Sequence, residues 1–456
     1  MTAYRAEPAI LSLGNEFYDP VTAADFPETT LRWRHDGAAS EVGLDGLSDE
    51  EWVRHFGRFE PLHDNLPQPL AMRYHGHQFR TYNPDLGDGR GFLFAQMRDG
   101  DSRLLDLGTK GSGQTPWSRA GDGRLTLKGG VREILATEML EALGVETSRT
   151  FSLIETGEAL QRGDEPSPTR SAVMVRLSHG HIRYGTFQRL AYLGETDNLD
   201  RLVDYCLQHF VPDGLDAPDR YAALLDHAVA GAARLAASYR VAGFVHGVLN
   251  TDNVNITGES FDYGPWRFAP RWDDAFTAAY FDQFGLYSFG RQAEALQWNV
   301  HQLALALRAV AEADSLIPAL KSFPDRYEAE LTSLMLWRLG IEPQGEADAT
   351  VVRTWEAALA ATDIEPDRAF FDWRGGTARH ADERYEGVAF KPFREAVADY
   401  APAEGALAHD YWSDDAPCSI LIDEMEACWS PIAERDDWQP LYAKVEAIRR
   451  MAAAHR

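Results

Sequence analysis

Cysteine is scarce in this chain, and long apolar runs are missing. Cys206, Cys418 and Cys428 are the three cysteines among 456 residues, too few for a disulfide framework or a cysteine-based zinc site. Such usage is typical of a reducing compartment, so we expect a cytoplasmic protein. Because no stretch of eighteen apolar residues occurs, we expect no membrane-spanning helix. The first residues lack the basic start and apolar core of a signal peptide.

Positive charge is also in short supply. The chain has 44 Lys and Arg against 71 Asp and Glu, which gives a net charge of −27. This acidity disfavours nonspecific binding to nucleic acid or anionic membranes, so neither is expected as a partner. A site for an anionic ligand must therefore be basic locally. Arg or Lys residues beside glycine-rich turns are the strongest candidates for such a site.

The most informative segment is 246–264, which reads HGVLNTDNVNITGESFDYG. An Asp-Asn pair followed by Asp-aromatic-Gly is how kinase-like folds hold Mg²⁺ against nucleotide phosphates. We therefore predict Asn253 and Asp262 as ligands of Mg²⁺ or Mn²⁺, and Asp252 as a proton acceptor. The alternative is that both motifs are plain turns, which Asp and Asn favour. A protein kinase would place its base two residues after the histidine, where this chain has Val248.

Lys110 and Glu133 are candidates for a phosphate clamp. Lys110 ends an apolar run that reads as a strand, and Glu133 lies 23 residues later in a segment with helical spacing of apolar residues. A strand lysine paired with a helix glutamate is the arrangement that kinase-like folds use to hold phosphates. The alternative is two unrelated surface charges.

Glycine-rich turns with arginines supply further candidates for binding phosphates. Closely spaced glycines let backbone N–H groups approach phosphate oxygens, and a neighbouring guanidinium adds a bidentate donor. A simple hairpin turn is the alternative for each loop. The candidates are Gly87, Gly89 and Arg90 in LGDGR, Asp122 and Gly123 in GDGR, and the strand-associated Arg176 and Arg183.

Secondary-structure patterns divide the chain into a strand-rich part and a helix-rich part. Residues 1–70 are expected to form an irregular wrapping segment. Strands are predicted at 92–97, 103–107 and 171–177, with one helix at 131–143. The longest later helices are predicted at 221–239 and 292–313, and linkers at 163–169 and 212–218.

This order predicts an α+β, bilobal protein-kinase-like fold. The strand-rich N-terminal lobe would cover 1–190, and the helical C-terminal lobe would cover 191–456 and carry the segment 246–264.

Several long strings resemble the selenoprotein O family, whose bacterial branch is known as YdiU. The resemblance spans roughly 60–310 and is carried by YHGHQF (74–79), LGDGR (86–90), the stretches 107–145 and 173–187, HGVLNTDNVNITGESFDYGPWRF (246–268) and QWNVHQLALAL (297–307). It implies a pseudokinase fold that binds ATP turned around relative to a kinase. It also implies transfer of AMP to Ser, Thr or Tyr hydroxyls of proteins.

The resemblance also assigns roles to the residues named above. Asp252 would accept the proton, with Asn253 and Asp262 on the metal. Glu133 would pair with Lys110, and the triphosphate would lie on Lys110, Arg176 and Arg183. The nucleotide would be lined by Gly87, Gly89, Arg90, Asp122 and Gly123.

The C-terminal third departs from the family's usual strings, and the chain ends in MAAAHR without a penultimate cysteine or selenocysteine. The departures leave open the choice of protein substrate and any redox control. Three other activities also stay open: UMP transfer from UTP, γ-phosphate transfer as in a kinase, and nucleotide binding without catalysis.

Overall fold

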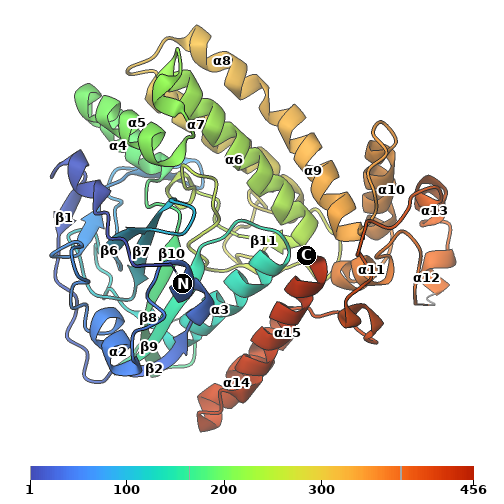
Figure 1. Ribbon diagram of the computed structural model, residues 1–456, viewed down its shortest axis with the longest axis horizontal. Helices are drawn as coiled ribbons and strands as arrows, with labels where there is room; N and C mark the ends of the chain where they lie inside the picture. The colour runs from blue at the N-terminus through green and yellow to red at the C-terminus, as the bar shows by residue number, and fades with distance from the viewer. Residues whose placement is uncertain (1, 164, 381–382) are drawn as a thin grey trace.

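An antiparallel sheet forms the core of the N-terminal lobe (Figure 1). The computed structural model describes residues 2–163, 165–380 and 383–456. The sheet runs in the order β1-β3-β6-β7-β10-β9-β2, and β8 pairs with β10 beside this path. Its strands are β1 (Tyr18–Pro20), β2 (Thr30–Arg34), β3 (Leu70–Met72), β6 (Leu93–Arg98), β7 (Leu104–Lys110), β8 (Leu125–Thr126), β9 (Arg149–Leu160) and β10 (Thr169–Ser178).

The first seventy residues are more regular than their sequence pattern indicates. They supply both ends of the sheet, β1 and β2, together with a 3-10 helix at Ala9–Leu13 and the helices α1 (Asp36–Glu41) and α2 (Asp49–Phe56). Ser48 and Glu51 form a capping box at the start of α2. Strands of three to five residues are too short for a periodic pattern, which is why the sequence reads as irregular.

Helix α3 (Leu127–Ala142) packs on β9 and β10 and confirms the helix predicted at 131–143. It begins earlier than predicted because Thr126 caps it, accepting the N–H of Gly129 at 3.1 Å. Gly130 lies directly on the sheet, since a Cβ there would sit 2.3 Å from the Leu153 side chain. The two consecutive glycines therefore let α3 approach the sheet closely, and this brings Glu133 over β10.

The C-terminal lobe is built around helix α6 (Arg220–Ala242), which contacts α7, α8 and α9. Between α6 and α7 the chain forms the two-stranded β11 (Phe244–Val245) and β12 (Arg267–Phe268). The other helices are α4 (Tyr184–Leu193), α5 (Thr196–Phe210), α7 (Gln292–Leu307), α8 (Ala313–Lys321), α9 (Phe323–Leu339), α10 (Asp348–Ala360), α11 (Pro366–Asp372), α12 (Glu383–Glu386), α13 (Lys391–Val397), α14 (Ile422–Arg435) and α15 (Gln439–His455).

Two sequence predictions are wrong in detail. The helix predicted at 292–313 ends at Leu307, and the apolar spacing continues only because Val310 and Ala311 pack on the core from the turn that follows. The predicted linkers lie inside the lobes: of 163–169, the residues that the structure describes (163 and 165–169) fall between β9 and β10 while 164 lies outside the described residues, and 212–218 joins α5 to α6. None of the described helices is long and apolar enough to cross a bilayer.

The last two helices return to the sheet, and α15 packs against α3 (Figure 1). Arg449 on α15 pairs with Glu138 on α3 at 2.7 Å, and the Tyr442 hydroxyl donates to the Arg32 carbonyl at 2.8 Å. The fold is thus bilobal and kinase-like as predicted, with an antiparallel sheet in the first lobe and helices in the second. The exact division at residue 190 stays a prediction, because α14 and α15 contact elements before it.

Candidate active site

A cleft of about 730 Å³ brings together residues from both parts of the chain. Eleven of the twelve predicted site residues line it: Gly87, Gly89, Arg90, Lys110, Asp122, Gly123, Arg176, Arg183, Asp252, Asn253 and Asp262. The twelfth, Glu133, is buried behind Lys110 with 1% of its surface exposed. The structure therefore brings all the predicted residues together, although they are spread over the sequence from Gly87 to Asp262.

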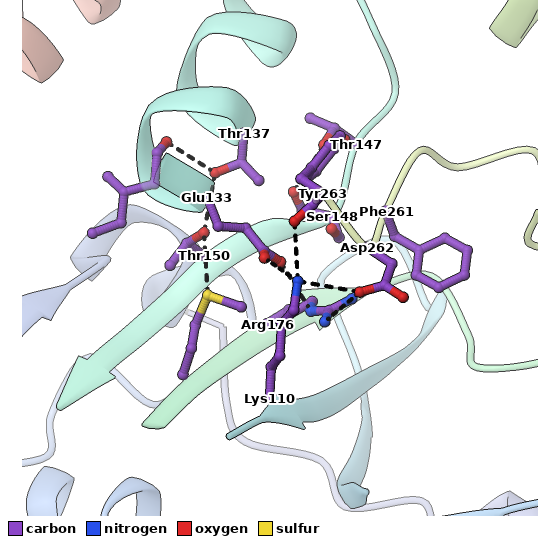
Figure 2. Close-up of polar contacts among 12 residues, drawn as sticks. Lys110, Glu133, Thr137, Thr147, Ser148, Thr150, Arg176, Phe261, Asp262 and Tyr263 are labelled. Carbon is purple, nitrogen blue, oxygen red and sulfur yellow. Dashed lines mark hydrogen bonds and ion pairs between the residues drawn. The ribbon is translucent and has the colours of Figure 1, made fainter. Parts of the chain in front are cut away.

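Lys110 and Glu133 form a buried ion pair at the base of this cleft. Lys110 Nζ lies 2.7 Å from Glu133 Oε2 and donates a further hydrogen bond to the Tyr263 carbonyl at 3.1 Å. Figure 2 shows both contacts as dashed lines. Burial lowers the pKa of Lys110, while Glu133 and Asp262 act to raise it. Arg176 Nε lies 3.1 Å from the other oxygen of Glu133. Glu133 thus pairs with two cations, and both of them line the cleft.

Asp262 faces three cations, of which Figure 2 shows Lys110 and Arg176. Its carboxylate lies 3.2 Å from Lys110 Nζ, 3.3 Å from Arg176 and 3.8 Å from Arg183. Burial alone would raise the pKa of this carboxyl, but the three cations hold it well below its usual range. Its backbone has φ of 60°, a strained conformation for a residue with a side chain. A fixed anion at a strained turn is typical of a functional position.

The surrounding segment is anchored by buried side chains. His246 Nε2 lies 3.0 Å from the Phe261 carbonyl, and because a carbonyl only accepts, this nitrogen carries the proton. The Tyr263 hydroxyl donates to Ser260 at 2.6 Å and contacts Thr147. These bonds fix the residues on both sides of Asp262, so the His and Tyr of the motif have structural roles here.

Arg183 joins the Asp252 segment to Asp88 in the LGDGR loop. Its guanidinium donates to the Asp252 carbonyl at 2.7 Å and to Asp88 Oδ1 at 3.3 Å. It is stacked between the rings of Tyr74 and Phe261, whose centroids lie 4.5 and 4.8 Å from Cζ. Burial opposes its charge, but Tyr74 and Asp88, together with the other carboxylates nearby, raise its pKa. Arg183 is therefore a rigidly held cation.

Asp252 has the properties of a general base. Its Oδ1 is buried without a hydrogen-bond partner among the residues that the structure describes. Burial raises its pKa from 3.8 to about 6, even though Arg183 acts to lower it. Gly76 faces this carboxylate so closely that a Cβ there would lie 3.0 Å from Oδ1. A carboxylate with a raised pKa and a free oxygen can accept a proton from a hydroxyl at neutral pH.

Asn253 and Asp262 fit the needs of a hard divalent cation. The Asn253 amide nitrogen donates to the Val248 carbonyl at 2.9 Å, which orients the side chain and leaves its oxygen as an acceptor. Mg²⁺ takes a few such oxygens and completes its shell with phosphate oxygens and water, so two protein ligands suffice. No cluster of three or more His, Cys, Asp or Glu ligands occurs among the described residues. His75 contacts the Tyr82 hydroxyl and His77 contacts the Gln188 amide, so both histidines have structural partners.

The two glycine-rich loops both pack against the segment 113–118, through Gly113 and Trp117. A Cβ at Gly87 would lie 2.4 Å from the Trp117 ring, and one at Gly89 would lie 2.9 Å from the Trp117 carbonyl. Gly123 has φ of 70°, and a Cβ there would lie 2.3 Å from the Gly113 backbone. Neither loop is a simple hairpin of the main sheet. Packing alone therefore requires these glycines, whatever the cleft binds.

Sequence reasoning missed several residues of the cleft. Asp88, between the glycines of LGDGR, is buried, accepts the N–H of Met72 at 3.0 Å and pairs with Arg183. The position of Asp88 inside the LGDGR motif could have indicated a site residue. Its pairing could not be predicted, because Arg183 lies 95 residues away in the sequence. Asp122 pairs with Arg162 at 2.8 Å on the rim. Arg119 was also missed; like the predicted Arg90, it lines the cleft and forms no ion pair within the described part of the chain.

Comparison with known proteins identifies the family. The family model described as "Protein adenylyltransferase SelO" matches residues 1–449. The chain belongs to the SelO family. It is 43% identical to the protein nucleotidyltransferase YdiU of Trichormus variabilis, over 97% of this chain and 95% of that protein. The YdiU proteins of Gloeobacter violaceus and Synechocystis are 45% and 42% identical over 97% of this chain. The predicted resemblance is thus confirmed, and it extends through the divergent C-terminal third. Membership in SelO places the chain among the nucleotidyltransferases.

Proposed function

We propose that this SelO protein transfers AMP from ATP to Ser, Thr or Tyr hydroxyls of proteins and releases pyrophosphate. The observation that carries the proposal is the state of Asp252: a buried carboxylate with an uncommitted oxygen in the same cleft as Lys110, Arg176 and Arg183. A cationic floor suits a triphosphate, and a free base suits an incoming hydroxyl. The cysteine usage and acidic surface support action in the cytoplasm, without a nucleic acid or membrane partner.

In this mechanism the chain's own residues bind, orient and move one proton. Lys110, Arg176 and Arg183 bind phosphate oxygens, while Glu133 keeps the first two in place. Asp252 takes the proton of the acceptor hydroxyl, whose oxygen bonds to the α-phosphorus as the bond to the bridging oxygen breaks. The leaving pyrophosphate takes the electron pair of that broken bond. When bound on Asn253 and Asp262, Mg²⁺ or Mn²⁺ supplies further neutralisation of phosphate charge.

Glycine-rich loop residues would line the nucleotide. Gly87 and Gly89 give the backbone close access, Arg90 adds a cation without an ion-pair partner in the described residues, and Asp122 and Gly123 line the same cleft. Val248 stands where a protein kinase has its base, and in this mechanism no base is needed at that position. Attack at the α-phosphorus requires a base at a different place from attack at the γ-phosphorus, and Asp252 serves there.

Mass spectrometry tests the proposal. After incubation with ATP and Mg²⁺, protein should gain the mass of AMP. Asp262→Ala should abolish the gain by removing both a metal ligand and the anion that orders three cations. Asp101→Ala, at an exposed position outside the cleft, is the matched control and should retain it. A gain of phosphate alone would show a kinase instead, and full activity of Asp262→Ala would refute the metal assignment.

A further inference from the structure

The hairpin of β4 (Gly76–Gln78) and β5 (Thr81–Asn83) packs against the segment that carries the proposed base. It comes from the string YHGHQF, to which the proposed mechanism gives no role. Its turn residues Phe79 and Arg80 have φ angles of 49° and 63°, although a two-residue turn of this kind normally contains Asn or Gly. Arg80 pairs with Glu294 at 2.8 Å. Strain that surrounding contacts keep in place is typical of functional segments.

Asn250 has its amide oxygen committed to this hairpin and to Tyr287. The backbone N–H of Phe79 and the hydroxyl of Tyr287 both donate to Asn250 Oδ1, at 3.0 and 2.8 Å. Because a backbone N–H only donates, these contacts decide which end of the amide is the oxygen. Asn250 is 5% exposed and lines the cleft two positions before Asp252. Its amide nitrogen donates to none of the described residues, so its N–H groups are left for a ligand in the cleft.

Gln78 presents a second amide to the same place. Its Oε1 accepts a hydrogen bond from Asn83 Nδ2 at 3.1 Å, which leaves the amide nitrogen for the cleft that Gln78 lines. Burial raises the pKa of Asp252, and the Gln78 side chain acts to lower it, so this amide lies beside the carboxylate. An ionised carboxylate only accepts hydrogen bonds, which is consistent with the nitrogen facing it. The amides of Gln78 and Asn250 are therefore the neutral donors nearest to the base.

These two amides complement a hydroxyl rather than the nucleotide. Among the described residues, neither amide is bonded to the three cations that would hold the phosphates. A hydroxyl has one proton and two lone pairs. The proton can go to Asp252 and one lone pair to the α-phosphorus, while the other lone pair accepts an amide N–H. A protonated lysine amine has no lone pair, so the same donors cannot bind it.

We propose that Gln78 and Asn250 bind the oxygen of the acceptor hydroxyl and hold it between Asp252 and the α-phosphorus. We call these two residues the acceptor subsite. The inference rests on the proposed function and adds to it the residues that receive the acceptor. The hydroxyl proton passes to Asp252 as the oxygen bonds to phosphorus, and the amides lose no proton. A cation in either position would pair with the base and weaken it, whereas a neutral amide does not.

Kinetics with an unfolded acceptor test the acceptor subsite. The probe is carboxymethylated lactalbumin, a permanently unfolded protein that exposes Ser, Thr and Tyr hydroxyls. Gln78→Met removes one donor without adding charge, so it should raise the KM for this acceptor about tenfold and leave the affinity for ATP unchanged. Gln208→Met, at an exposed position on α5 outside the cleft, is the matched control and should keep the wild-type KM.

Asn250→Asp removes the other donor and keeps the structural bonds. The oxygen that accepts from Phe79 and Tyr287 is retained, so the melting temperature should stay near that of the wild type. AMP transfer should nevertheless fall roughly 10²-fold, because an oxygen then stands where the acceptor needs a donor. A residue that only supported the hairpin would not give this separation of stability from transfer.

The outcomes distinguish a failure of the inference from a failure of the proposed function. An unchanged acceptor KM in Gln78→Met, or undiminished transfer by Asn250→Asp, overturns the acceptor subsite while AMP transfer stands. A loss of ATP affinity in Gln78→Met as large as its loss of transfer assigns the amide to the nucleotide and also overturns it. If Asn250→Asp melts well below the wild type, Gln78→Met alone decides. A wild type that transfers AMP to neither this acceptor nor any other protein overturns the proposed function, and the inference with it.

Discussion

Replacing Asp252 by asparagine should change how the stability of the protein depends on pH. The folded state raises the pKa of this carboxyl from 3.8 to about 6, because burial penalises the charged form. The group's stabilising contribution is complete below pH 3.8 and is lost as pH rises through about 6. The whole shift corresponds to roughly 3 kcal/mol in the free energy of unfolding, of which about 1.4 kcal/mol falls between pH 5 and pH 8.

Urea unfolding of the nucleotide-free protein measures this contribution. We expect the wild type to lose about 1.4 kcal/mol more than Asp252→Asn between pH 5 and pH 8. Asp101→Asn, at an exposed position, serves as the control and should follow the wild type. A difference between wild type and Asp252→Asn that stays constant over this range would show that the carboxylate is solvated or paired. The assignment of Asp252 as a poised base would then fail.

Four further predictions concern the cleft and its supports. AMP transfer by the wild type should decline as pH falls through about 6, since a protonated Asp252 accepts no proton; a rate that is flat from pH 5 to pH 8 would contradict this. Lys110→Met should lower the transfer rate by roughly 10²–10³-fold while far-UV circular dichroism stays unchanged. Gly123→Ala should destabilise the fold by about 2 kcal/mol in urea, because its φ is 70° and the Gly113 backbone occupies the space, whereas Gly46→Ala, with open space around it, should have little effect. Arg449→Ala should remove the arginine partner of Glu138, leaving only His35 Nε2 at 3.4 Å, and lower the melting temperature, with no loss expected from Arg435→Ala on the surface.

Local patterns were enough to predict much of the cleft. Asp252, Asn253 and Asp262 share one short segment, and the Lys110–Glu133 pair follows from a strand and a helix that each have a clear periodicity. The long strings shared with SelO proteins predicted the same residues independently. The roles given to these side chains remain predictions until the variants are measured.

Contacts between residues far apart in the chain could not be predicted from the sequence. Asp88 meets Arg183 across 95 positions, and α15 returns to α3 across more than 300. Nothing in a local window encodes such contacts, because they depend on how whole elements pack. The turn at Phe79 and Arg80 was missed for another reason. Its residues contradict the usual turn chemistry, so only the surrounding contacts explain it.

The most direct test of the central claim is a transfer assay with ATP labelled at either the α- or the γ-phosphorus, run with the wild type and with Asp252→Ala. The proposal predicts that α-label appears on protein, that γ-label leaves as pyrophosphate, and that Asp252→Ala transfers neither. Appearance of γ-label on protein with ADP as the product would contradict it and establish a kinase.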